Sequence, residues 1–152
     1  MPSTVIHRPS GLDRIQESRC SLEIPVQAPV LDGTPLKILI ADDEHVIADT
    51  LAIILKGSGF NTAVVYDGAA ALAKAQTWKP DLLLSDVMMP GVDGIEAAIE
   101  ICKLIPMCRV LLFSGYAESA GLLHDPRVQG HKFQILQKPL HPSDLIARLQ
   151  TV

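Results

Sequence analysis

The chain has 152 residues, of which 48% are hydrophobic and 20% charged, so it can form one well-packed core but not two ordinary domains. The formal net charge of -4 leaves no basic surplus for neutralising phosphates, which argues against nucleic acid as a direct partner. The three cysteines lack metal-site spacing and no apolar stretch reaches membrane-spanning length, so we expect a cytoplasmic protein without membrane insertion.

Residues 1–35 differ from the rest because five prolines interrupt a largely polar sequence. We expect a flexible, Pro-rich N-terminal extension over residues 1–35, followed by one domain over residues 36–152. The alternative for part of the extension is a docking helix that begins near Ser10 and Asp13. Four residues of this helix recur at roughly helical spacing and would form one stripe: Leu12, Ile15, Arg19 and Leu22. Short isolated helices are marginal in water, so we favour the flexible tail and assign it no function.

From Leu36 onward, short apolar runs alternate with longer amphipathic ones. This pattern is typical of an α/β fold in which crossover helices join parallel strands. Strands are predicted near residues 37–41, 61–65, 82–86, 109–113 and 133–137, and helices near residues 44–57, 68–77, 93–104, 117–123 and 142–151. The third run has no polar residue before Ser85, which indicates a central strand covered on both faces, whereas Asn61 and Thr62 favour an edge position for the second.

Polar side chains stand at or just beyond the ends of four of these strands: Asp42, Asp43, Asp86, Ser114 and Lys138. In open α/β sheets the ligand crevice lies beyond the carboxyl ends of the strands, so we expect these side chains to converge. Taken singly, each has a simpler interpretation. The aspartate pair could cap the following helix, Ser114 could be an ordinary turn serine, and Lys138 could be solvated.

Three neighbouring carboxylates repel one another and stay ionised only beside compensating cations. Mg²⁺ prefers oxygen ligands and often shares a site between one or two carboxylates and a phosphate, so Asp42, Asp43 and Asp86 are candidate ligands. Lys138 would supply a second cation. Asp86 could then act as the nucleophile in phosphoryl transfer, because an aspartate can form a covalent phosphorylated intermediate and needs no general base.

Four motifs occur in the order found in one known family. They are Asp42-Asp43-Glu44 after the first strand, Asp86 followed by Met89-Pro90 and Asp93-Gly94, Ser114-Gly115 after the fourth strand, and Lys138-Pro139 after the fifth. With these motifs, residues 36–152 resemble the receiver domain of bacterial two-component response regulators. The resemblance implies a flavodoxin-like (βα)5 doubly wound parallel sheet with strand order 2-1-3-4-5.

The resemblance also implies a role for each site residue. Asp86 would accept a phosphoryl group from a sensor histidine kinase or a histidine phosphotransfer protein. Asp43 would hold Mg²⁺ directly and Asp42 largely through water, with the backbone carbonyl of Met88 as a further ligand. Ser114 and Lys138 would contact the phosphoryl group.

Further expectations concern the fifth strand and the segment after it. The resemblance implies a cis Lys138-Pro139 bond, with His141 capping the last helix and Pro142 in its first turn. Ile135 stands where the family usually carries an aromatic residue that reports phosphorylation. Either Phe133, on the same strand face, could substitute for it, or Tyr116, close to Ser114, could move instead.

The sequence supports two functions of different classes. The chain stops soon after the fifth predicted helix, so we expect a stand-alone response regulator that signals through an unknown protein target. Such a protein is not an enzyme beyond its own phosphorylation and dephosphorylation. The alternative is a phosphorylation-independent interaction module that keeps the receiver fold, with Ile135 marking lost switching.

Overall fold

The computed structural model describes residues 30–31, 33–115 and 120–151. Most of the expected extension, including the candidate helix between Ser10 and Leu22, lies outside these residues, and the boundary at residue 36 stays a prediction. Two short strands, β1 (Val30–Leu31) and β2 (Thr34–Pro35), form an antiparallel pair directly before the main sheet. The sequence analysis expected no strand in this stretch.

The main sheet has five strands, and each pairs in parallel with its neighbours. Its spatial order is β4-β3-β5-β6-β7, which is order 2-1-3-4-5 when counted along the chain from β3. The flavodoxin-like arrangement expected from the sequence is therefore confirmed. The strands are β3 (Lys37–Ala41), β4 (Asn61–Val65), β5 (Leu82–Asp86), β6 (Arg109–Ser114) and β7 (Gln134–Gln137).

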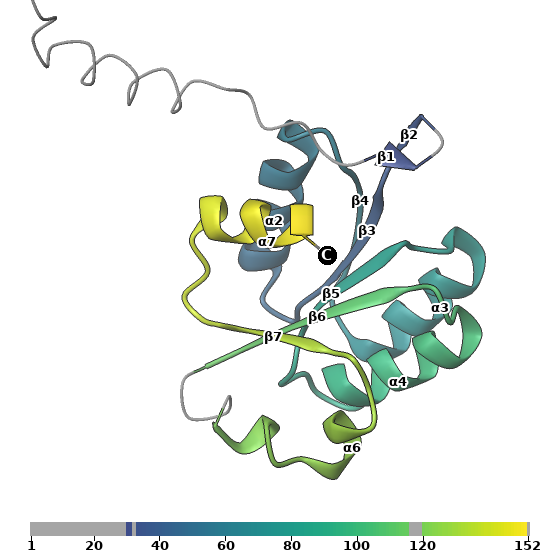
Figure 1. Cartoon of the computed structure of the whole chain (residues 1–152), viewed down its shortest axis with the longest axis vertical. Helices are drawn as coiled ribbons and strands as arrows, with labels where there is room; N and C mark the ends of the chain where they lie inside the picture. The colour runs from purple at the N-terminus through teal and green to yellow at the C-terminus, as the bar shows by residue number, and fades with distance from the viewer. Residues whose placement is uncertain (1–29, 32, 116–119, 152) are drawn as a thin grey trace, which may run out of the picture.

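Helices cover both faces of this sheet, as Figure 1 shows. One face packs against α2 and α7 through a core that includes Leu55, Leu84 and Leu145, and the other packs against α3 and α4 through Leu83 and Ile101. These helices are α2 (His45–Gly57), α3 (Gly68–Trp78), α4 (Gly94–Leu104) and α7 (Pro142–Thr151). None of the helices in the described part of the chain is long and apolar enough to span a membrane.

The positions of the strands follow from their side chains. All five residues of β5 are buried, as expected for a strand covered on both faces, and β5 lies at the centre of the sheet. β4 lies at an edge, as its polar residues Asn61 and Thr62 predicted. Because β5 is central, its last residue, Asp86, is held at the middle of the sheet's carboxyl edge.

The segment between β6 and β7 differs from the prediction. Of the expected helix over residues 117–123, residues 120–122 are helical and residues 116–119 lie outside the described part. A further short helix, α6 (Pro126–Gln129), forms where the sequence predicts no helix. Asp125 caps this helix by accepting a hydrogen bond from the backbone N–H of Arg127, and proline is favoured in a first helical turn.

Gly94, the first residue of α4, packs against the strand that carries Asp86. Its N–H donates to the carbonyl of Val87 at 2.9 Å, and an added Cβ would overlap the carbonyl oxygen of Asp86. Asp93 caps the helix by accepting from the N–H of Glu96. The tight turn therefore needs glycine at position 94 for space, since no left-handed backbone conformation is involved.

We expect Gly94→Ala to lower the free energy of unfolding by about 2–4 kcal/mol, because backbone must shift to admit the methyl group. Gly57→Ala is the matched control: nothing lies within 4 Å of its added Cβ, and alanine in a helix should stabilise by about 0.5–1 kcal/mol. Urea unfolding of both variants measures the difference. Equal stabilities would show that the turn around Gly94 is not tightly packed.

Candidate functional site

The structure brings all five polar residues predicted from the strand ends to one edge of the sheet. Asp42 and Asp43 follow β3, Asp86 ends β5, Ser114 ends β6, and Lys138 follows β7. These four strands are consecutive in the sheet, so their carboxyl ends lie side by side. One carboxylate oxygen from each of the three aspartates lies within 4.8 Å of the other two.

Burial sets the electrostatics of this cluster. Asp42 and Ser114 are fully buried and Asp86 is 4% exposed, whereas Asp43 is exposed. Burial raises the pKa of Asp42 to about 6, although the hydrogen bond from the backbone N–H of Glu44 lowers it. Burial also raises the pKa of Asp86, and the ammonium of Lys138 opposes this shift. The site thus concentrates negative charge where water is scarce.

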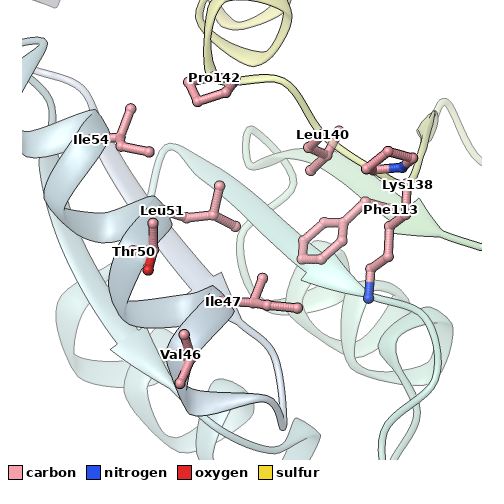
Figure 2. A pocket seen from close by; sticks show the side chains of 10 residues that line it. Val46, Ile47, Thr50, Leu51, Ile54, Phe113, Lys138, Leu140 and Pro142 are labelled. Atoms are coloured by element: carbon pink, nitrogen blue, oxygen red, sulfur yellow. The ribbon is translucent and has the colours of Figure 1, made fainter.

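Lys138 supplies positive charge beside Asp86. Its Nζ lies 3.4 Å from Oδ2 of Asp86 and 5.1 Å from the centre of the Phe113 ring, toward which it is seen to extend in Figure 2. The backbone N–H of Lys138 donates to the carbonyl of Ser114 at 2.7 Å, which ties the ends of β6 and β7 together. The Lys138-Pro139 bond is cis, as expected.

The two oxygens of the Asp42 side chain have different roles. Oδ1 accepts the N–H of Glu44 at 2.9 Å, which forms a local turn before α2. Oδ2 is buried and has no hydrogen-bond partner among the described residues. The simple capping interpretation therefore explains only one oxygen, because a buried carboxylate oxygen without a partner is costly. The helix itself begins after Glu44, which makes no side-chain capping bond.

The chain was compared with known families, proteins and structures. A model of the response regulator receiver domain matches residues 38–150. The chain belongs to the response regulator receiver domain family. Members of this family are signalling modules of two-component systems, and phosphorylation and Mg²⁺ are typical of them.

Individual relatives agree with this family. The DNA-binding response regulator MtrA of Mycolicibacterium smegmatis is 29% identical over 123 residues, covering 79% of this chain and 51% of MtrA. The alkaline phosphatase synthesis transcriptional regulatory protein PhoP of Bacillus subtilis is 33% identical over 116 residues, covering 76% of this chain and 48% of PhoP. The receiver thus spans about half the length of these curated relatives.

Solved structures resemble the receiver over most of their own length. The chemotaxis response regulator CheY4 of Vibrio cholerae has a TM-score of 0.67 and 29% identity, covering 78% of this chain and 98% of CheY4. A two-component transcriptional regulator, AraC, from Clostridium phytofermentans has a TM-score of 0.68 and 34% identity, covering 76% of this chain and 91% of that chain.

The acidic residues fit the requirements of a hard divalent cation. Mg²⁺ takes carboxylate oxygens and keeps several waters, so it suits three converging carboxylates of which one is exposed. The buried Oδ2 of Asp42 has no hydrogen-bond donor among the described residues, and a cation or one of its bound waters would take the place of that donor. One such ion would satisfy both the charge of the cluster and this unpaired oxygen.

Other predicted residues of the receiver lie as follows. The side chain of Met88 is 59% exposed, so the residue faces solvent beside Asp86. The imidazole of His141 accepts the N–H of Ser143 at 3.3 Å, which confirms it as the cap before α7. Ile135, in β7, and Phe133, directly before β7, are half-buried against the same core cluster. Phe133 stacks on His131, with ring centres 4.8 Å apart, just before the amino end of the strand.

Sequence reasoning missed an ionic bridge beside the site. Arg127 on α6 contacts Asp93 Oδ2 and Asp125 Oδ2, both at 3.0 Å. Its guanidinium lowers the pKa of Asp125, and these two aspartates are the N-caps of α4 and α6. The cap pattern at Asp93 and Asp125 was visible in the sequence, but their shared partner depends on the tertiary fold.

The raised pKa of Asp42 gives the metal-free receiver a pH-dependent stability. Its folded value of about 6 exceeds the ordinary 3.8, so the folded state binds this proton more tightly than the unfolded state. Stability should therefore fall as the pH rises from about 4 to about 6, by up to about 3 kcal/mol from this group. Urea unfolding in the presence of a chelator should show the loss, and Asp42→Asn should remove most of it.

Glu100→Gln is the control, because Glu100 is a partly exposed carboxylate of α4 that pairs with Lys103. It should keep the pH dependence of the unmodified receiver. Adding Mg²⁺ should raise the unfolding temperature more near neutral pH than near pH 5, since the ion competes with the proton for the same carboxylates. Identical pH profiles for Asp42→Asn and Glu100→Gln would contradict the assignment of the loss to Asp42.

Proposed function

We propose that this receiver accepts a phosphoryl group on Asp86 from a histidine kinase or a histidine phosphotransfer protein, and then signals through contact with another protein. The observation that supports the proposal is the meeting of three carboxylates, a hydroxyl and an ammonium at one edge of the sheet. The carboxylate ligand atoms lie within 4.8 Å of one another, and Lys138 Nζ lies 3.4 Å from Asp86. This arrangement suits phosphoryl transfer better than a simple solvated surface.

Asp86 is the proposed nucleophile. An oxygen of its carboxylate would form a bond to phosphorus as the bond from phosphorus to the imidazole nitrogen of the donor breaks. Lys138 favours the ionised carboxylate that this step requires, which offsets the effect of burial on the pKa of Asp86. No general base is needed, because the attacking group is already an anion.

Asp42, Asp43, Asp86 and the backbone carbonyl of Met88 are the proposed ligands of Mg²⁺, with Asp42 acting largely through water. When bound, the ion supplies positive charge close to the phosphoryl oxygens. Lys138 would contact another of these oxygens from the opposite side. The buried Ser114, at the end of β6, would donate its hydroxyl to the phosphoryl group and draw its loop inward.

The proposed output is contact with an unidentified protein, and the proposed location is the cytoplasm. MtrA is named as a DNA-binding regulator, but the receiver spans about half of it, so we assign no DNA binding to this chain. Phosphorylation and dephosphorylation of Asp86 are the only reactions that we propose. We also propose a stand-alone role for this receiver, in which the partner protein provides the output.

The first test is phosphorylation by acetyl phosphate with Mg²⁺, followed by the mass of the intact protein. We expect one added phosphoryl group, which is absent in Asp86→Asn and present in Asp144→Asn, an exposed carboxylate of α7. An unchanged mass under conditions that modify other receivers would contradict the proposal. It would favour the phosphorylation-independent module, for which Ile135 in β7 is the motivating residue.

The second test removes the ammonium while preserving much of the length of the side chain. Lys138→Met should slow phosphorylation by acetyl phosphate about 10²-fold, the effect typical of losing one electrostatic contact to a developing charge. Lys103→Met, at an exposed position of α4, should keep the original rate. Equal rates for the two variants in a stopped time course would show that Lys138 does not stabilise the transferred group.

A further inference from the structure

An apolar groove lies between α2 and the segment that joins β7 to α7. It has a volume of about 520 Å³ and is seen in Figure 2. Val46, Ile47 and Ile54 form the wall on α2, Leu140 and Pro142 form the opposite wall, and Phe113 lies between them. Lys138 lines the groove as well, so the groove adjoins the candidate phosphorylation site.

The groove exposes apolar side chains to solvent. Val46 is 80% exposed, whereas the neighbouring Ile47, and Ile54 about two turns further along the same helix, are half-buried. Exposed apolar surface that is continuous with a groove usually marks a binding surface. One wall is a helix and the other is the segment that joins β7 to α7, and an apolar groove of this kind can receive the apolar face of another helix.

We propose that this groove is the docking site of the chain's own residues 10–24. This stretch carries Leu12, Ile15 and Leu22 on one stripe at helical spacing, with Ser10 placed as a cap. Arg19 falls on the same stripe. The exposed carboxylates of Asp43 and Glu44, three and two positions before Val46, provide an acidic edge that would suit this arginine.

The lengths of the segment and the groove agree. The groove wall from Val46 to Ile54 extends about 12 Å along α2, and a helix over residues 10–22 would extend about 18 Å. Residues 23–29 would connect this helix to Val30 and can span about 23 Å when extended. The carbonyl of Leu36 accepts the N–H of Asn61, which follows α2, so the chain enters the fold at the end of the molecule where α2 finishes.

Because the segment and the groove belong to one chain, even a weak contact between them would keep the segment docked for much of the time. A short flexible connector gives an effective concentration in the millimolar range, so a contact with a millimolar dissociation constant would be about half occupied. The helix is marginal in isolation, but burial of Leu12, Ile15 and Leu22 in the groove would stabilise it.

The test uses the full chain with the photo-crosslinking residue p-benzoylphenylalanine in place of Val46. Irradiation followed by peptide mass spectrometry should identify a monomeric product in which position 46 is joined to a peptide from residues 10–24. The same residue at Met107, which is 88% exposed outside the groove, is the control and should give about tenfold less of this product. Similar yields from the two positions would overturn the proposal.

Variants of the segment provide a second readout that does not depend on folding of the core. Leu12→Asp combined with Ile15→Asp should lower the yield at least about tenfold, because two apolar side chains no longer enter the groove. Ser21→Asp, off the stripe, should leave it unchanged. Cross-links found only in covalent dimers would overturn the proposal, because a second copy would then occupy the groove.

The docking proposal does not rest on the proposed function. The cross-link should form equally in a chain that also carries Asp86→Asn. Failure of the cross-link with intact phosphorylation would therefore remove only the docking proposal, and failure of phosphorylation would leave docking in place.

Discussion

An imbalance of charge at the carboxyl edge of the sheet is the constraint on which the site depends. Three carboxylates lie within 4.8 Å of one another, and one ammonium lies 3.4 Å from Asp86. The parallel fold imposes this crowding because it aligns the ends of β3, β5, β6 and β7. The apolar core beneath the edge holds these groups together, and added positive charge relieves their repulsion.

The sequence predicted the parts of this structure that follow from local pattern. Apolar runs located all five strands to within one residue, because each run is bounded by polar or turn-forming residues. Asp86 and Lys138 could be placed together because parallel strands end at one edge. The hairpin of β1 and β2 and the short α6 were missed, since two-residue strands and four-residue helices have too few residues to show a period.

Contacts between side chains that do not share the carboxyl edge of the sheet could not be predicted. Arg127 and Asp93 are 34 positions apart, and nothing in their separate motifs indicates that they meet. The sequence also left two interpretations open for Asp42, as a helix cap or a metal ligand. The structure divides them between two atoms, since Oδ1 makes the local turn and Oδ2 is left buried and unpaired among the described residues.

The bridge made by Arg127 has a mechanical consequence. One guanidinium holds the first residues of both α4 and α6, and α4 follows directly from the loop behind Asp86. Both ion pairs are at least partly exposed, so each contributes little to stability and can break and re-form while the helices stay folded. The bridge therefore links the loop behind Asp86 to the segment that leads into β7 along the outside of the molecule, through contacts that do not involve the sheet.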